Sequence, residues 1–245
     1  PSVPETVFAL GLDDRIVGVT TFCDYPPEAA GKERVGDTLR PSIEKIVALK
    51  PDLVIASTSS QLEQFVRKLD ELGVPIYVSS PRNIEGVLDS IRRIGEITSA
   101  QQRAEALVSR LHGRIEAVNE RIVSRDKPRV LFLLGSEPLI TAGRPSFITD
   151  LIARAGGESI SAGEESDYPQ FSFETAIARQ PQVIFIQSGE SGLPDRLKLT
   201  PAARTGRVFH IDDALLLRPG PRIVEGLEQM AQRIHPEAFK DQLAR

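Results

Sequence analysis

SIEKIVALKPDLVI, residues 42–55, and SFETAIARQPQVIF, residues 172–185, align with each other without a gap, and Ser, Glu, Ala and Pro coincide. Each copy begins with a serine suited to cap a helix, continues through about two helical turns and stops at a proline. An apolar run typical of a buried strand follows. Two copies of one helix–strand unit are too few for a solenoid, so they predict two similar lobes, each containing this unit.

Short apolar runs rich in β-branched residues also occur outside the repeated segments. They predict strands, and stretches with apolar residues at helical spacing separate them, as in βα units. The predicted strands are Arg15–Val19, Leu53–Ala56, Ile76–Val78, Arg129–Leu134, Val183–Ile186 and Val208–Ile211. Gln61–Leu72 and Arg222–Ile234 are predicted helices, and Gly73 is expected to end the first of them. The fold class is therefore expected to be α/β.

The centre of the chain differs from both ends. Ser99-Ala100-Gln101-Gln102 matches a capping box, and the helical pattern after it reaches about Arg125 without proline. A helix of this length spans about 35–40 Å, too long for an ordinary crossover, and predicts a strut between two Rossmann-like lobes. We expect an N-terminal lobe at 1–98, a connecting helix at 99–126 and a C-terminal lobe at 127–245, with the ligand in a cleft between the lobes.

Charge, cysteine content and hydropathy exclude several classes of protein. The 30 basic and 34 acidic residues give a net charge of -4 without a Lys/Arg block, so nucleic acid is not an expected partner. The single Cys23 excludes a disulfide or a thiolate cluster within one chain. No apolar run approaches the roughly 18–20 residues of a membrane span. The opening Pro1-Ser2-Val3-Pro4 does not resemble a signal peptide, so any export signal is expected to have been removed.

Five motifs occur together along the chain: Val17-Gly18-Val19, Asp24-Tyr25-Pro26-Pro27, Glu44–Val54, Thr141-Ala142-Gly143 and Ala155-Gly156-Gly157. As a set they resemble the helical-hinge (class III) family of periplasmic binding proteins, which serve ABC importers of cobalamin, haem and ferric siderophores. The resemblance covers nearly the whole chain, and the cobalamin-binding branch is the most similar because its members carry a segment like Asp24-Tyr25-Pro26-Pro27.

The resemblance implies a substrate-binding protein that captures a corrinoid and has no catalytic residue, metal site or intrinsic cofactor. Its implied partners are the metal-chelate ligand and a permease dimer with its ATPase subunits. It is expected to be monomeric, peripheral to the membrane, and either periplasmic or extracytoplasmic and lipid-anchored. Family members usually begin with a strand before the segment matched by Pro1–Thr6, so we expect either a trimmed sequence or an incomplete first sheet.

In such relatives, loops at the carboxyl ends of strands line the ligand cleft. The residues implied here are Phe22, Tyr25, Thr38, Ser57, Tyr168, Phe171 and Arg218. Aromatic rings supply flat apolar surface for a planar chelate, and a cation supplies a polar anchor. Thr38 and Ser57 align with positions where cobalamin-binding relatives place tryptophan, and this departure leaves haem and siderophores open as ligands. The alternative interpretation of the phenyl rings is that they belong to the core.

Glu44 and Glu174 occupy the same place in the two repeated segments, in the first turn of a short helix. The family resemblance implies that they dock to arginines of the permease. The alternative is that the helix dipole alone favours a carboxylate there.

Metal and catalytic motifs are weak. His112, His210 and His235 show no metal-ligand spacing, and Cys23 reads as a small buried residue or, alternatively, as an axial ligand or reactive thiol. An enzyme such as a tetrapyrrole chelatase, or a corrinoid-binding module without a transporter, remains the alternative from another class.

Overall fold

The computed structural model describes residues 1–57 and 62–240, which form two compact units. Of these described residues, the N-terminal unit comprises 1–57, 62–81 and 85–109, and the C-terminal unit comprises 82–84 and 110–240. Both units contain parallel strands and flanking helices, so the predicted α/β class is confirmed.

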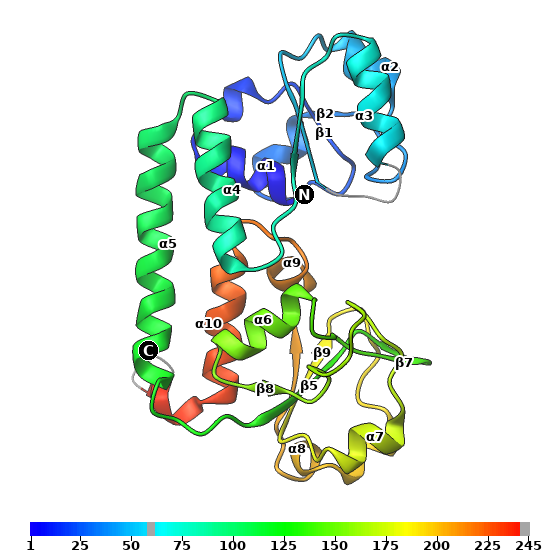
Figure 1. The fold of residues 1–245 in the computed structure, drawn as a ribbon, viewed down its shortest axis with the longest axis vertical. Helices are drawn as coiled ribbons and strands as arrows, with labels where there is room; N and C mark the ends of the chain where they lie inside the picture. The colour runs from blue at the N-terminus through cyan, green and yellow to red at the C-terminus, as the bar shows by residue number, and fades with distance from the viewer. Residues whose placement is uncertain (58–61, 241–245) are drawn as a thin grey trace. The chain divides into compact units, whose positions relative to one another are not determined.

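The N-terminal unit holds two separate pairs of parallel strands. β1 (Gly18–Val19) pairs with β2 (Glu33–Arg34), and β3 (Val54–Ser57) pairs with β4 (Ile76–Ser79). Its helices are α1 (Ser2–Ala9), α2 (Ile43–Ala48), α3 (Leu62–Glu71) and α4 (Ile84–Ile97), with 3₁₀ turns at Asp13–Arg15 and Pro27–Gly31. In Figure 1, α1 and α4 lie on one side of these strands, and α2 and α3 lie on the other.

The C-terminal unit holds one four-stranded parallel sheet in the order β10-β9-β5-β8. The strands are β5 (Arg129–Leu133), β8 (Glu158–Ser159), β9 (Val183–Gln187) and β10 (Val208–Ile211); β6 (Gly135–Ser136) and β7 (Leu139–Ile140) form a small antiparallel pair. The helices are α6 (Phe147–Arg154), α7 (Phe173–Ala178), α8 (Pro201–Arg204), α9 (Asp213–Leu216) and α10 (Ile223–Ile234), with 3₁₀ turns at Asp195–Leu199 and Pro236–Phe239.

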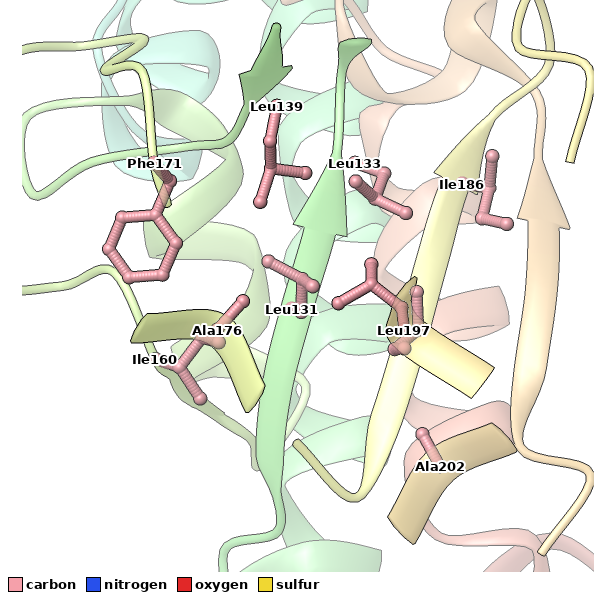
Figure 2. Packing of buried hydrophobic residues seen from close by; sticks show 10 residues of the cluster. Leu131, Leu133, Leu139, Ile160, Phe171, Ala176, Ile186, Leu197 and Ala202 are labelled. Atoms are coloured by element: carbon pink, nitrogen blue, oxygen red, sulfur yellow. The ribbon is translucent and has the colours of Figure 1, made fainter. Parts of the chain in front are cut away.

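The core of the C-terminal unit explains why the sequences of β5 and β9 are continuous apolar runs. Alternate residues of a strand point to opposite faces of a sheet. Leu131, Leu133, Ile184 and Ile186 pack on one face against Ala176 of α7, Leu197 and Ala202. Figure 2 shows these β5 side chains pointing to this shared face. Val130, which precedes Leu131, is also fully buried and lies beside Gly157 and Ile152 of α6 on the other face. Helices therefore cover both faces of the central strands.

The long central helix, α5, runs unbroken from Gln101 to Ile122. Its start differs from the capping box that the sequence predicts. Ser99 adopts a left-handed φ of 57°, and its N–H and that of Ala100 bond back to Glu96 and Gly95 at the end of α4. The carbonyl of Ala100 accepts the first bond of α5, from Ala104. The capping-box interpretation is therefore wrong, because Ser99 ends the preceding helix instead of capping this one.

The repeated segments adopt matching local structures. Ser42 caps α2 by accepting a bond from the N–H of Lys45, and Ser172 caps α7 through the N–H of Thr175. Each six-residue helix is followed by a residue with positive φ directly before proline: Lys50 at 48° and Gln180 at 51°. The two units therefore share one helix–turn–strand element, as the repeat predicts.

The strands after these turns differ in burial. Val183 to Ile186 of β9 are fully buried, whereas all four residues of β3 are only half-buried. The expectation of a buried strand in each copy therefore holds for β9 and is wrong for β3.

Candidate functional site

The loop after β1 presents two exposed aromatic side chains. Phe22 is 59% exposed and Tyr25 is 41% exposed, whereas Cys23 between them is buried. The Cys23 N–H closes a turn onto the Thr20 carbonyl at 3.1 Å, and Cys23 Sγ lies 3.2 Å from Thr20 Oγ1. Burial of Cys23 turns the adjacent Phe22 toward solvent.

Arg34 holds this loop in place. Its Nη1 donates hydrogen bonds of 2.9 Å to the carbonyls of both Thr20 and Cys23. No sequence pattern marks Arg34 as a site residue, because its strand β2 is only two residues long and gives no periodic signal. The guanidinium thus fixes the backbone from which Phe22 projects.

A second loop, residues 36–41, carries Thr38. Asp37 Oδ1 accepts hydrogen bonds from the N–H groups of Leu39 and Arg40 at 2.7 and 2.6 Å, which is an Asx-type turn. Gly36 has a φ of 102°, and a Cβ there would lie 2.6 Å from the Arg40 carbonyl oxygen, so the loop closes only around glycine. Thr38 is half-buried and, together with Ser57 at the end of β3, lines a cavity of about 960 Å³ within the N-terminal unit.

In the C-terminal unit, Tyr168 lies on a segment that runs along residues 139–143. The N–H of Gly143 donates to the Asp167 carbonyl at 2.9 Å, and the N–H of Thr141 donates to the Pro169 carbonyl at 3.2 Å. A Cβ at Gly143 would lie 2.0 Å from the Ser166 carbonyl oxygen, which explains the glycine of the Thr-Ala-Gly motif. Tyr168 itself remains 50% exposed. Partial burial, aided by the negative charge of Asp167, raises the pKa of its phenol above the ordinary value.

Phe171 lies on the same segment but points inward. It is 8% exposed and belongs to the cluster around Leu131 and Leu139, with the Arg179 guanidinium carbon 5.1 Å from its ring centroid. Figure 2 shows the ring on the Leu139 side of that cluster. Its packing corresponds to the alternative interpretation of this residue, a ring in the core.

Arg218 lies between α9 and α10 and is half-buried. Its carbonyl accepts a 2.7 Å bond from the N–H of Gly220, so the Arg-Pro-Gly segment turns tightly before α10.

Glu44 and Glu174 are both exposed in the first turns of α2 and α7. Glu174 forms a solvent-exposed ion pair of 3.8 Å with Arg196, whose guanidinium also covers the Phe173 ring. A helix that leads into a parallel strand begins toward the carboxyl edge of the sheet. Within its own unit, each glutamate therefore lies toward the edge that carries the candidate ligand loops.

The histidines are dispersed in sequence, and only His235 is buried. Its Nε2–H donates to the Gly156 carbonyl at 3.1 Å, and burial lowers the pKa of the imidazole below its ordinary value. Across residues 1–57 and 62–240, no three His, Cys, Asp or Glu side chains are grouped as ligands for a metal ion. None of the helices in these ranges combines the length and apolar character needed to cross a bilayer.

The fold defines a two-unit α/β protein, and solved structures of periplasmic binding proteins match it closely. A haem-binding protein from Roseiflexus in its apo form superimposes with a TM-score of 0.85 at 28% identity, covering 97% of this chain and 96% of that one. The vitamin B12-binding protein of Vibrio cholerae gives a TM-score of 0.84 at 30% identity, over 96% and 94% of the two chains.

The chain belongs to the periplasmic binding protein family, whose model matches residues 1–215. An uncharacterised ABC transporter substrate-binding lipoprotein of Bacillus subtilis is 30% identical to it over 98% of this chain and 80% of that protein. The chain is therefore a substrate-binding protein of the ABC importer type and not an enzyme, which confirms both expectations.

Proposed function

We propose that this protein captures a corrinoid outside the cytoplasmic membrane and delivers it to an ABC permease. The observation that carries the proposal is the set of exposed aromatic side chains on fixed loops, namely Phe22 and Tyr25 in one unit and Tyr168 in the other. An exposed ring held by its backbone can stack on a flat apolar ligand with little further loss of entropy. Relatives named as vitamin B12-binding proteins support a corrinoid.

Polar contacts come from three further residues in this proposal. Thr38 and Ser57 offer hydroxyl groups to the amide side chains of a corrinoid. Arg218 supplies a permanently charged donor for an amide or phosphate oxygen. Phe171 is not part of the proposed site, because its ring is used in the core.

Haem is the second candidate, since structural relatives named as haem-binding proteins are equally similar. Tyr168 can contact the two ligands in different ways. A tyrosine can bind haem iron as a phenolate, whereas a corrinoid requires only the neutral ring for stacking. A Tyr168 variant that keeps the ring and removes the hydroxyl therefore distinguishes the two ligands.

Absorption spectra test the proposal directly. The protein is incubated separately with cyanocobalamin, haemin and a ferric siderophore, then freed of unbound ligand by gel filtration. We expect the cobalamin spectrum to co-elute with the protein. Retention of haemin or the siderophore alone would transfer the function to that ligand, and retention of none would overturn the chelate class.

We further propose that Glu44 and Glu174 dock the permease. They occupy equivalent positions in the two units, are exposed, and stand on short helices capped by serine. One carboxylate on each unit suits a partner with two-fold symmetry that presents a cation to each. The protein acts as a monomer in this arrangement, with the permease and its ATPase subunits as partners.

A further inference from the structure

The internal repeat identifies the residue of the C-terminal unit that corresponds to Ser57. The repeated segments align at one constant offset, and β3 and β9 continue it, so Val54 corresponds to Ile184 and Ser57 to Gln187. Each of the last two residues ends its strand. Figure 2 shows Ile186, the residue before Gln187, beside the tip of the β9 arrow. In open α/β sheets, ligands bind outside the carboxyl ends of the strands, and Gln187 lies at such an end.

The side-chain amide of Gln187 is not used by the fold. The residue is half-buried, and within residues 1–57 and 62–240 its amide has no hydrogen-bond partner. No polar side-chain atom in these ranges is both buried and unpaired, so the amide reaches solvent. A Cβ added at Gly189 would meet only Gln187 Nε2 among the described residues, at 3.8 Å, so the turn leaves space beside the amide. The amide can therefore donate to a ligand and accept from it.

A carboxylate stands on the turn that follows Gln187. The N–H of Glu190 donates to the Gln187 carbonyl at 3.0 Å, which closes this turn. Ser136 Oγ donates to Glu190 Oε2 at 2.6 Å, and both residues are half-buried. Ser136 lies in β6, directly after β5, so the bond joins the segments that follow the two central strands of the sheet. Among the described residues, Glu190 Oε1 accepts no hydrogen bond, so it remains available as an acceptor.

An amide and a carboxylate on one turn treat amides and acids differently. A primary amide of a ligand can accept from the Gln187 NH₂ group and donate to the Glu190 carboxylate. An ionised carboxylic acid can also accept from Gln187, but it has no proton for Glu190 and is repelled by its charge. Corrinoids carry amide side chains, whereas haem carries propionates. The charge of Glu190 is thus a repulsive element of the kind that specificity requires.

We propose that Gln187 and Glu190 form a ligand subsite at the carboxyl ends of β5 and β9, and that this subsite selects amide-bearing chelates over carboxylate-bearing ones. Ser136 fixes the Glu190 carboxylate within it. The inference rests on the proposed capture of a chelate, and it gives a reason, independent of the aromatic rings, for a corrinoid as that chelate.

Two corrinoids that lack the nucleotide and differ in their side chains test the subsite by calorimetry. Dicyanocobinamide carries amides, and dicyanocobyrinic acid carries carboxylic acids in their place. We expect the parent protein to bind dicyanocobinamide more tightly. Gln187→Leu keeps the size of the side chain and removes its hydrogen bonds, so it should raise the Kd for dicyanocobinamide about threefold to tenfold. Glu190→Gln should lower the Kd for dicyanocobyrinic acid about tenfold, yet change that for dicyanocobinamide less than about threefold, because the glutamine oxygen still accepts.

Glu158→Gln is the matched control. It removes an exposed carboxylate at the start of β8, at the opposite edge of the same parallel sheet, and should change neither Kd. Three results would overturn the subsite: an unchanged ratio of the two Kd values in Glu190→Gln, parental affinity for dicyanocobinamide in Gln187→Leu, or an equal change of the ratio in Glu158→Gln.

Haemin separates failure of the subsite from failure of the corrinoid proposal. If the parent protein binds neither corrinoid, the corrinoid proposal fails, and the variants are titrated with haemin. Glu190→Gln should then bind haemin more tightly than the parent, because the propionates lose a repelling charge. Unchanged or absent haemin binding would overturn the subsite as well. If the corrinoids bind and the variants show no selectivity, only the subsite fails.

Discussion

Replacement of Tyr168 by alanine should weaken corrinoid binding, and the exposed area of the tyrosine side chain limits how much binding free energy is lost. An aromatic side chain buries about 150–250 Å² when fully covered. Tyr168 is 50% exposed, so about 100 Å² remains for a ligand to cover. At about 25 cal/mol per Å² this area is worth about 2.5 kcal/mol. Tyr168→Ala should therefore raise Kd by at most about 70-fold, and by about eightfold if the ligand covers half of that area.

Tyr168→Phe separates stacking from iron ligation. The ring remains, so cyanocobalamin affinity should stay within about twofold of the parent, a change well below 1 kcal/mol. If the natural ligand is haem held by the phenolate, the same variant should instead lose affinity and the phenolate-to-iron charge-transfer band.

Isothermal titration calorimetry with cyanocobalamin measures the affinities, and haemin is titrated by absorbance. Leu199→Ala is a matched control in the same unit, since Leu199 is 62% exposed and lies outside the proposed site. The reasoning is refuted if Tyr168→Ala binds cyanocobalamin, haemin and ferric siderophore as the parent does, or if Leu199→Ala shows the same loss.

Three further predictions concern docking and stability. Changing both Glu44 and Glu174 to Arg should abolish uptake in cells by like-charge repulsion at the permease, while ligand Kd stays unchanged and each single change causes partial loss. Glu228→Ala should lower the free energy of unfolding in urea by about 1–2 kcal/mol, because it removes a bidentate pair in which Arg114 Nε and Nη2 donate to the two carboxylate oxygens at 2.8 and 2.7 Å. The lowered pKa of His235 means that the unfolded chain binds the proton first, so stability should fall as pH drops below about 6.5 and stay level above it. Urea titrations at pH 5.5 and 7.5 measure that slope, which His235→Gln should reduce.

Each of these predictions has a control or a contrary outcome. Glu63→Arg reverses an exposed charge in the first turn of α3 and should leave uptake intact. Normal uptake by the double variant, or loss of its ligand binding, would return both glutamates to a role in the helix start alone. His112→Gln, at an exposed position, should leave the acid slope in place. An unchanged unfolding free energy for Glu228→Ala would mean that solvent already screens the pair.

The amino-acid sequence predicted the positions of strands best where both faces of the strand are buried. The predicted strands Arg129–Leu134 and Val183–Ile186 agree with β5 and β9 to within one residue, because central parallel strands are continuous apolar runs. Gly73 ends α3 as predicted, with a φ of 69°. The two-residue strands β1, β2 and β8 were missed or overextended, since they are too short for any periodicity. Arg15, predicted as strand, instead ends a 3₁₀ turn.

The amino-acid sequence predicted the candidate site less well, because it does not show whether an aromatic side chain packs in the core or faces solvent. Phe22 and Phe171 are both phenylalanines in predicted loops, yet Phe22 is exposed beside the buried Cys23 and Phe171 fills the core near Leu139. Hydrogen bonds between residues distant in the sequence determine which of the two rings is exposed. The clamp from Arg34 onto the Phe22 loop joins residues 11 and 14 positions apart, and no local pattern signals such a contact.

The turns at Lys50 and Gln180 have a consequence for engineering. Both residues hold a left-handed backbone directly before proline, although neither is glycine. A side chain in this conformation costs about 1–2 kcal/mol, so relieving the strain in both copies should raise the stability of the fold. Asparagine tolerates the left-handed region and, unlike glycine, does not greatly loosen the unfolded chain. The pair of positions is thus a starting point for a more heat-resistant scaffold whose ligand loops are unchanged.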